Sequence, residues 1–531
     1  MKKKIQCTCR RFLSAALGAA LLCGCGAASD TSAPADAGCE APADDGGSYA
    51  PALEEAYHPE YNTEEYSAIT DNRFLSVRDH PLSTFAADVD TASYANMRRY
   101  VNSGELPPAD AIRVEELINY FHYDYPLPEE NEPFSCTTEV VQCPWNEDTL
   151  LMRIGIATEP VHTEELPPQN LVFLIDVSGS MEGPDRLDLV KRAFLLLCEQ
   201  LRSEDTISII TYASSDQVLL QGAGSESRDM IMYAIESLSA GGSTNGSAGI
   251  ETAYRIAEKY KTEDSNNRII LATDGDLNLG ITSEGDLKRL VEEKRESGIC
   301  LSVMGFGSGN LKDNKMETLA DNGNGNYAYI DSISQARRTL IEEMGATLFT
   351  VAKDVKLQVE FNPDMLKGYR LTGYENRLME SEDFADDTKD GGELGAGHQV
   401  TVLYELVPLD SPMEIESTEL RYQEQPESSG SEEFCTVSIR CKEPDSNTST
   451  QYDYPVGAAV SDEMSPSTAL ASAVAQAGML LRDSPYSGNA DYASVLDQLE
   501  QLEESIRSPY TDEFVELVMR MKRLDRMGDD Q

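Results

Sequence analysis

The sequence predicts an α/β protein with a doubly wound parallel sheet, inserted in or flanked by a β-sandwich, and small helical regions at both ends. Three observations predict this fold. Between residues 166 and 350, short apolar runs alternate with amphipathic helical patterns, as in parallel sheets covered by helices. Strand-like runs without helices lie on either side, at 131–165 and 351–445. Apolar residues recur at helical spacing in 67–130 and 446–531.

The composition indicates several folded domains with an acidic surface. The chain has 531 residues, 40% of them hydrophobic, and this length suits about two to four domains. It carries 43 Lys and Arg against 93 Asp and Glu, a formal net charge of −50. Such a surface repels nucleic acid, whose binding needs basic residues in excess, and attracts cations. We therefore expect no nucleic-acid partner.

The first 24 residues have the pattern of a secretory signal peptide. A basic start precedes an apolar run at 12–22, which is too short to span a bilayer. The run ends in Leu22-Cys23-Gly24-Cys25, which resembles a bacterial lipobox and makes Cys25 the expected site of lipidation. Cys23 stands where Ala or Ser is usual, so an ordinary signal peptide is the alternative. Both interpretations predict an extracytoplasmic protein, and lipidation predicts an anchor in the cell membrane.

Two interpretations of the N-terminal region follow from its composition and motifs. Residues 25–66 contain few large apolar groups, which predicts a disordered tether. In the following region, Asp90 or Thr91 is expected to cap a helix that begins at Ala92. Asp88-Val-Asp90-Thr91 resembles the DxDx[TV] phosphatase motif, but Ala92 occupies its fifth position, so capping is favoured over catalysis. Whether Asp88 and Asp90 bind a second cation stays open.

The alternating stretch supplies the elements of the doubly wound sheet. Its first strand, 171–175, is a continuous apolar run, as expected for a strand that is buried on both faces. Further strands are expected at 206–211, 268–272, 300–305 and 327–330. Helices are expected at 186–201, 228–238, 248–260, 287–296, 312–321 and 334–344. This order predicts a parallel sheet of about six strands.

The flanking β regions are expected to pair with each other, so that the α/β domain is an insertion within a sandwich. Strands are expected at 134–142 and 150–157 before the insertion, and at 354–361, 369–374, 399–407, 417–422 and 434–440 after it. Amphipathic helices are expected at 466–481, 493–507 and 512–523.

Oxygen-bearing side chains follow two apolar strands and lie in one glycine-rich loop. Asp176, Ser178 and Ser180 alternate directly after the first strand, and ligand sites of doubly wound folds lie at the carboxyl ends of strands. Thr244 lies in the glycine-rich loop, and Asp274 ends another apolar strand. Carboxylate and hydroxyl oxygens are ligands of hard cations. The pattern predicts a Mg²⁺ site, with Mn²⁺ or Ca²⁺ as alternatives.

Together these segments resemble the metal ion-dependent adhesion site of von Willebrand factor type A domains. Asp176, Ser178 and Ser180 match its DxSxS motif, Thr244 its threonine, and Asp274 its last aspartate. The resemblance implies that the serines and the threonine coordinate the ion directly, and the aspartates directly or through water. It also implies a free coordination position for a partner's carboxylate. The expected partner is therefore a protein that offers an acidic side chain.

Segments outside the α/β stretch carry a second resemblance. Residues 83–94, 113–121 and 368–377 are similar to a bacterial (YfbK-like) lipoprotein family, in which a type A domain lies between N-terminal and C-terminal companion regions. The resemblance extends over residues 67–525 and implies an architecture more than a role.

The sequence favours a binding module of the cell envelope over an enzyme. The alternative is a structural or assembly factor in which the metal only stabilises the domain. A hydrolase is less favoured, because no nucleophile and base can be paired and the histidines are scattered, at His58, His80, His122, His162 and His398. The acidic run 380–393 lacks EF-hand spacing, so a solvated loop is favoured there over a Ca²⁺ site.

Overall fold

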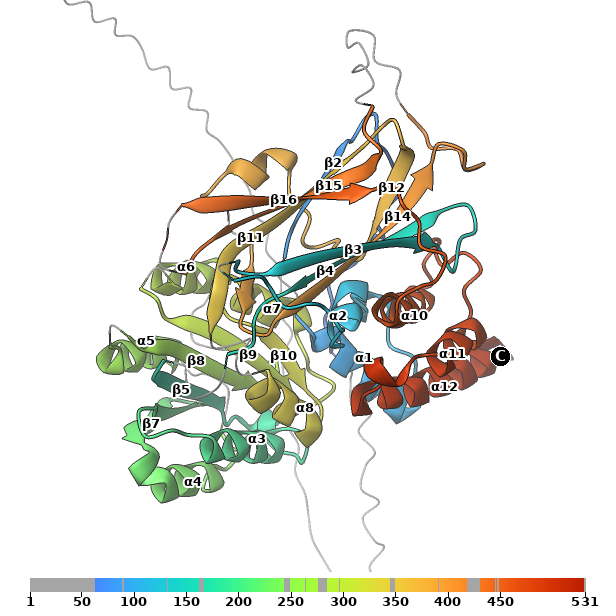
Figure 1. The fold of residues 1–531 in the computed structure, drawn as a ribbon. Coiled ribbons are helices and arrows are strands. Elements are labelled where there is room, and N and C mark those ends of the chain that lie inside the picture. The colour runs from blue at the N-terminus through green and yellow to red at the C-terminus, as the bar shows by residue number, and fades with distance from the viewer. Residues whose placement is uncertain are drawn as a thin grey trace, which may run out of the picture. The chain divides into compact units, whose positions relative to one another are not determined.

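A computed structural model describes residues 63–529, apart from 88–89, 131, 162–166, 243–248, 263, 276–283, 296, 344–348, 390, 418–429, 445 and 447. Figure 1 shows strands gathered into sheets, with helices packed against them. One sheet has six strands and lies among helices, and two further sheets form a sandwich. The predicted combination of a doubly wound sheet and a flanking β-sandwich is confirmed.

The six-stranded sheet has the order β10-β9-β8-β5-β6-β7. Its strands are β5 (Gln169–Asp176), β6 (Thr206–Tyr212), β7 (Asp216–Gly224), β8 (Asn266–Thr273), β9 (Cys300–Phe306) and β10 (Tyr327–Ile330). Neighbours pair in parallel, except β6 and β7, which are antiparallel. The sequence patterns did not predict β7. It is a half-exposed edge strand, and the short turn before it leaves no room for the helical crossover that a parallel pair needs.

Helices cover both faces of this sheet. They are α3 (Leu187–Glu199), α4 (Arg228–Glu236), α5 (Gly249–Tyr260), α6 (Glu284–Arg295), α7 (Asp313–Asn322) and α8 (Ile333–Arg337), which continues as a π-helical turn, Arg338–Glu342. In β5, Phe173 and Ile175 pack with α3, whereas Val172 and Leu174 pack with α5. The uninterrupted apolar run of β5 therefore reflects burial on both faces.

The sandwich is made by strands from both sides of the α/β domain. Sheet β1-β12-β14-β4-β3 packs on sheet β13-β11-β15-β16. Strand β2 joins the second sheet by pairing with β11. The strands are β1 (Leu75–Ser76), β2 (Leu82–Ala86), β3 (Ser135–Gln142), β4 (Leu150–Ala157), β11 (Thr350–Phe361), β12 (Leu366–Thr372), β13 (Glu393–Gly395), β14 (Gln399–Pro408), β15 (Glu433–Lys442) and β16 (Ser449–Gly457). Strand β4 pairs with β14 along its whole length. Most of the strand expected at 417–422 lies outside the described residues.

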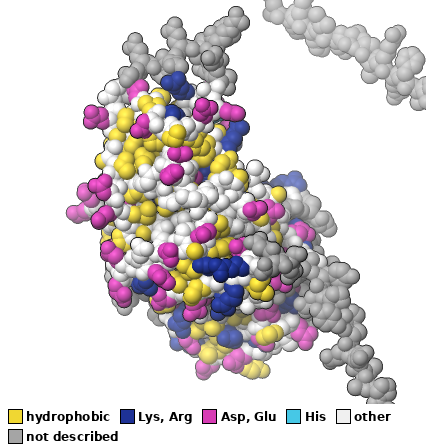
Figure 2. Space-filling model, turned by 90° about the vertical axis from the view of Figure 1, so that its right-hand side faces the viewer, with side chains coloured by type: hydrophobic (Ala, Val, Ile, Leu, Met, Phe, Trp, Pro, Cys, Tyr) yellow, Lys and Arg dark blue, Asp and Glu magenta, His cyan; other side chains and the backbone are white. Residues whose placement is uncertain are grey.

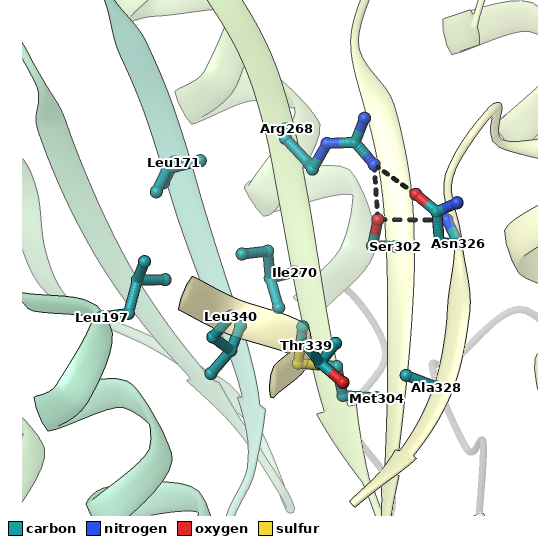
Figure 3. A pocket seen from close by; sticks show the side chains of 10 residues that line it. All are labelled: Leu171, Leu197, Arg268, Ile270, Ser302, Met304, Asn326, Ala328, Thr339 and Leu340. Carbon is teal, nitrogen blue, oxygen red and sulfur yellow. Dashed lines mark hydrogen bonds between the residues drawn. The ribbon is translucent and has the colours of Figure 1, made fainter. Parts of the chain in front are cut away.

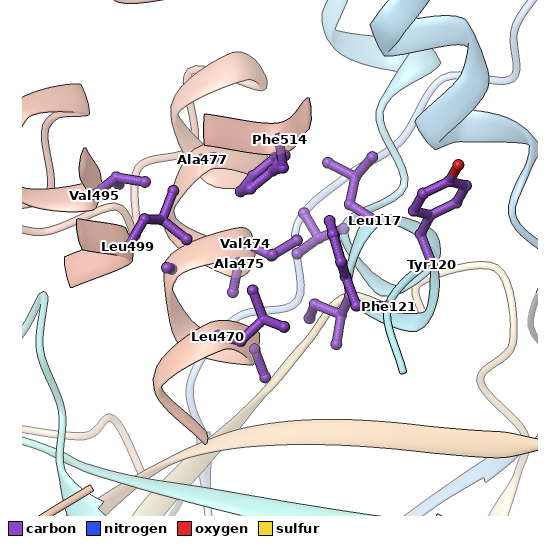
Figure 4. Packing of buried hydrophobic residues seen from close by; sticks show 14 of the residues in the cluster. Leu117, Tyr120, Phe121, Leu470, Val474, Ala475, Ala477, Val495, Leu499 and Phe514 are labelled. Atoms are coloured by element: carbon purple, nitrogen blue, oxygen red, sulfur yellow. The ribbon is translucent and has the colours of Figure 1, made fainter. Parts of the chain in front are cut away.

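Helices from the two ends of the folded chain share one core. They are α1 (Ala92–Ser103), α2 (Val114–Asn119), α10 (Pro466–Leu481), α11 (Tyr492–Glu500) and α12 (Pro509–Asp529). Figure 4 shows Leu117 and Phe121 from the N-terminal part lying against Val474 and Phe514 from the C-terminal part. No helix within the described residues combines the length and apolar character needed to cross a membrane.

Of the two expected caps of α1, Thr91 does not act through its side chain. Thr91 is the N-cap residue but makes no side-chain hydrogen bond to the helix. Asp90 is buried and accepts a hydrogen bond from the backbone N–H of Tyr327 (2.9 Å) in β10. Glu116 of α2 performs the capping role, because its carboxylate accepts from the N–H of Ser93 (2.8 Å). A partner distant in sequence thus replaces the local cap. Asp88 lies outside the described residues.

Glu115 of α2 is an acid enclosed by the fold, and it makes stability depend on pH. It is 2% exposed, and burial together with the charge of Glu375 raises its pKa to about 7. A carboxyl whose pKa is higher in the folded than in the unfolded state stabilises the fold while it is protonated. That contribution is lost as the pH rises from the unfolded value of 4.5 through about 7.

The variant Glu115→Gln stays neutral at every pH, so it is expected to unfold with a larger free energy than the wild type at about pH 8, by on the order of 1–3 kcal/mol. The difference is expected to shrink at about pH 5. Urea unfolding of both chains at the two pH values measures it. Glu105→Gln, at an exposed position, is the control. An identical pH dependence of Glu115→Gln and the wild type would contradict the assignment.

Candidate metal centre

Three of the five predicted metal ligands lie together where β5 ends. Asp176 is the last residue of β5 and is fully buried, as is Ser178. The backbone N–H of Ser178 donates to Asp176 Oδ1 (2.9 Å), which fixes the turn that leaves the strand. The hydroxyls of Ser178 and Ser180 are 2.9 Å apart. The alternation of the motif therefore places one carboxylate and two hydroxyls at one point.

Strand β8 brings the third motif to the same edge of the sheet. It pairs in parallel with β5, and Asp274, which is 2% exposed, directly follows its last residue, Thr273. The hydroxyl of Thr273 donates to Asp176 Oδ2 (3.3 Å) and accepts from the N–H of Gly275 (3.2 Å). Thr273 thus positions Asp176, a role that the sequence analysis missed although the residue precedes a predicted ligand.

The glycine-rich loop is hydrogen-bonded to the DxSxS turn. The N–H of Gly241 donates to the carbonyl of Val177 (2.8 Å), and the N–H of Gly179 donates to the carbonyl of Gly242 (3.2 Å). Gly242 has a φ of +91°, and a Cβ there would lie 2.8 Å from Ser214 Oγ. The backbone just before Thr244 is therefore held beside the site. Thr244 itself lies outside the described residues, so its role as a ligand stays a prediction.

The electrostatics of this cluster suit a small divalent cation. Burial raises the pKa of Asp176 to about 6, against hydrogen bonds from Ser178 that lower it, and the negative charge of Asp274 raises it further. Two carboxylates thus stand close together in a buried place, where a cation would offset their repulsion. The donors are carboxylate and hydroxyl oxygens, which hard cations such as Mg²⁺ prefer.

Arg186 joins the DxSxS turn to the loop after β9. Its Nη1 donates to the carbonyl of Ser180 (3.1 Å) and its Nη2 to the carbonyl of Ser308 (2.7 Å). The side chain lies over Gly307, where a Cβ would come within 2.5 Å of Arg186 Cγ. Arg186 therefore fixes the backbone of Ser180 while leaving its hydroxyl free of that contact. Nothing in the sequence between β9 and α7 predicted this contact.

The segment Thr63–Tyr66 is hydrogen-bonded to the same loop after β9. The folded part of the chain therefore includes these residues, which were expected to belong to the tether. The Glu64 side chain is 2% exposed. Its carboxylate accepts from the N–H of Gly309 (2.7 Å) and from the hydroxyl of Tyr100 (2.6 Å), and it pairs with Arg99 (2.9 Å). Glu64 lies in the segment that the sequence assigned to the tether. It is buried because three donors from elements distant in the chain bind its carboxylate.

A second group of buried acids lies between α2, α7 and the loop after β12. Single carboxylate oxygens of Asp90, Glu116 and Glu317 lie within 4.8 Å of one another. Arg377 pairs with Asp90 (3.2 Å) and Glu317 (3.3 Å), and Arg113 pairs with Glu116. The group is therefore an ion-pair network that joins the α/β domain to its companions.

The acidic run 380–393 is partly neutralised within the protein. Asp387 pairs with Arg440 (2.9 Å) and accepts from the hydroxyl of Ser449 (2.6 Å). Lys389 lies 3.6 Å from Asp383. Among its described residues, this run supplies no group of three close carboxylates. A solvated, ion-paired loop thus remains the better interpretation.

Figure 3 shows a cavity in the interior of the α/β domain that is too small for a sizeable ligand. This cavity of about 30 Å³ lies toward the amino ends of the strands, where Arg268 donates to Ser302 Oγ (2.6 Å). Such a volume holds about one water molecule.

Three family models match the chain. A model of the von Willebrand factor type A domain matches residues 170–343, one described as von Willebrand factor matches 60–153, and one of the C-terminal region of uncharacterized protein YfbK matches 346–524. The uncharacterized protein YfbK of Escherichia coli (strain K12) is 40% identical over 466 residues, which cover 86% of this chain and 80% of that protein.

Two further proteins are similar to the chain at lower identity. Inter-alpha-trypsin inhibitor heavy chain H3 of Homo sapiens is 29% identical over 161 residues, covering 29% of this chain and 18% of that protein. A solved structure of a von Willebrand factor type A protein from Catenulispora acidiphila is 16% identical, with a TM-score of 0.37, and covers 62% of this chain and 74% of the other.

Gly275, which follows Asp274, tests how tightly this edge of the sheet is packed. It has a φ of +104°, and a Cβ there would lie 2.6 Å from the backbone N of Lys312 and 2.7 Å from the carbonyl O of Asn310. Gly275→Ala is therefore expected to lower the free energy of unfolding by more than about 2 kcal/mol. Gly309→Ala is the control, because its φ is +86° but a Cβ there meets open space. Thermal unfolding of both variants measures the difference, and equal losses would contradict the clash.

Proposed function

The chain belongs to the YfbK family of proteins with a von Willebrand factor type A domain, and from that premise we propose that it binds a protein partner through a Mg²⁺-dependent adhesion site. Type A domains commonly mediate protein–protein interaction and often bind a divalent metal at this site. The observation that carries the proposal is the buried cluster of Asp176, Ser178 and Ser180 at the end of β5, beside Asp274.

The residues of the proposed site have different roles in binding the ion. The hydroxyls of Ser178, Ser180 and Thr244 serve as direct ligands, and Asp176 and Asp274 complete the set, directly or through water. When bound, Mg²⁺ supplies positive charge and one coordination position that a partner's carboxylate can occupy. Mn²⁺ or Ca²⁺ are alternatives with the same preference for oxygen. The chain's own contribution is rigidity, because hydrogen bonds orient Asp176 before the ion arrives.

The proposal places this site outside the cytoplasm, on a chain that lipid on Cys25 holds to the membrane. Its support is the sequence Leu22-Cys23-Gly24-Cys25 after a basic and apolar start. The acidic surface also suits this role, since it disfavours contact with anionic lipid and leaves the site available for a partner.

The proposal excludes catalysis as the main role and competes with a purely structural one. In a structural or assembly factor, the metal would only stabilise the α/β domain. The two roles separate at Asp176, because Asp176→Ala removes the ion in both cases. The binding role predicts lost partner affinity with an intact fold, and the structural role predicts lowered stability with partner affinity preserved.

The decisive experiment uses the chain from residue 26 to 531 as bait for partners, in Mg²⁺ and in EDTA. A partner retained in Mg²⁺ is expected to be lost in EDTA and with Asp176→Ala. Calorimetric titration with Mg²⁺ is expected to show an affinity loss on the order of 100-fold for this variant, with unchanged circular dichroism. Asp188→Ala, at an exposed position of α3, is the control and should bind Mg²⁺ like the wild type. A partner that binds equally well in EDTA would refute the mechanism.

The anchor has its own test. The full chain with Cys25→Ser, expressed in a bacterium fed radiolabelled palmitate, is expected to lose both the label and its recovery in the membrane fraction. Cys23→Ser is the control and should keep both, since it restores the usual residue at that position. Label that persists in Cys25→Ser would show that lipidation does not occur at this cysteine.

A further inference from the structure

A groove of about 580 Å³ opens at one end of the β-sandwich, where loops from both sheets meet. It lies at the end of β3 and start of β4, the turn before β12, and the end of β14. Residues from both sheets line it, among them Asp148, Met365, Leu409, Asp410, Phe434 and Val460. Its size is that of ordinary ligand sites, and it shares no residue with the metal centre.

Part of the groove is apolar and open to solvent. Phe434 is buried beneath it, at 4% exposure, whereas Leu409 and Val460 are 46% and 44% exposed. Figure 2 shows hydrophobic side chains gathered over the upper part of one face, at the height of the sandwich, with acidic side chains around them. Two half-exposed aliphatic side chains above the buried Phe434 give the hollow an apolar wall that an apolar side chain of a ligand can fill.

The rest of the groove is acidic. Glu147, Asp148, Asp364 and Asp410 line it, and no Lys or Arg does. Within the part of the chain that the structure describes, Glu147, Asp148 and Asp410 form no ion pair. Lys367 is not a lining residue, and its ammonium donates to the carbonyl of Ser411. The hollow therefore combines apolar surface with three carboxylates, those of Glu147, Asp148 and Asp410, that form no ion pair among the described residues.

Backbone hydrogen bonds hold the walls of the groove in place. The N–H of Leu409 donates to the carbonyl of Met365 (3.2 Å), and the N–H of Asn362 donates to that of Phe434 (2.9 Å). On the other side, the N–H of Ser461 donates to the carbonyl of Val140 (2.8 Å). Each loop is tied to a neighbouring strand or turn, so the groove exists before a ligand arrives and little ordering is needed to bind one.

We propose that this groove binds a short basic and apolar peptide segment of a protein partner. An apolar side chain of the segment fills the hollow over Phe434, between Leu409 and Val460. Lys or Arg side chains on either side of it pair with the carboxylates at the edge, Asp148 and Asp410 among them. The apolar contact supplies most of the affinity, and the charges select the partner and speed its approach.

Charge disfavours three other occupants that an apolar hollow could admit. An acidic peptide and an anionic lipid surface are both repelled by the carboxylates that line the groove. A second copy of this chain, at a net charge of −50, is repelled as well. The groove thus complements the metal centre in chemistry, because the metal centre attracts a carboxylate and the groove attracts a cation.

The probe is an array of hexapeptides in which each apolar residue is flanked by basic, acidic or neutral residues, exposed to the chain from residue 26 to 531 in EDTA. Basic and apolar peptides are expected to bind above the rest. The best of them, labelled with fluorescein, is then titrated in solution. If no peptide binds, or if acidic peptides bind equally well, the proposal is refuted.

Groove variants separate a specific site from the attraction of any cation to an acidic protein. Val460→Lys and the double variant Asp148→Asn/Asp410→Asn are each expected to weaken binding on the order of tenfold. Met519→Lys, at a position 45% exposed on α12, and Asp188→Asn/Asp497→Asn, at exposed positions, are the matched controls and should change it less than about twofold. Equal losses in groove and control variants would refute the site.

This test is independent of the metal-dependent function. The variant Asp176→Ala is expected to bind the labelled peptide like the wild type, in EDTA and in Mg²⁺ alike. Peptide binding that requires both Mg²⁺ and Asp176 would refute the groove and assign the peptide to the metal centre.

Discussion

Burial of β5 on both faces is the constraint on which the rest of the structure depends. Five apolar residues of this central strand pack alternately against α3 and α5, at Leu171, Val172, Phe173, Leu174 and Ile175. No polar side chain can be accommodated along that run without losing the core. The polar side chains of the candidate metal site therefore lie at the carboxyl end of β5, where Asp176 and the turn after it meet the end of β8.

Buried arginines join this domain to the companion regions. Arg98 of α1 is 3% exposed and pairs with Asp331 after β10 (2.6 Å) and with Glu513 of α12 (3.1 Å). Arg338, in the π-helical turn after α8, donates to the carbonyl of Tyr120, and its guanidinium stacks on the Tyr120 ring. Such pairs pay a desolvation cost, so they contribute orientation more than net stability. These contacts therefore join the α/β domain to α1, to α12 and to the end of α2.

The two binding surfaces that we infer belong to different parts of the fold and have opposite chemistry. The metal centre lies at the carboxyl ends of parallel strands, and the groove lies where antiparallel strands turn. A partner that offers both an acidic side chain and a basic, apolar segment would bind the metal centre with the first and the groove with the second. The net charge of the whole chain, −50, disfavours partners that offer acid alone.

The sequence by itself determined the doubly wound sheet, the flanking sandwich strands and the metal motif around Asp176, because each rests on local periodicity or on residues a few positions apart. Tertiary structure alone decided which partners distant groups take. Asp90 accepts a hydrogen bond from the backbone of β10, Glu64 is buried by donors from other elements, and Thr273 orients Asp176 across two strands. The groove likewise has no signature in the sequence, since loops that are far apart in the chain build it. Local patterns record what a segment must become, whereas contacts between segments depend on how the whole chain packs.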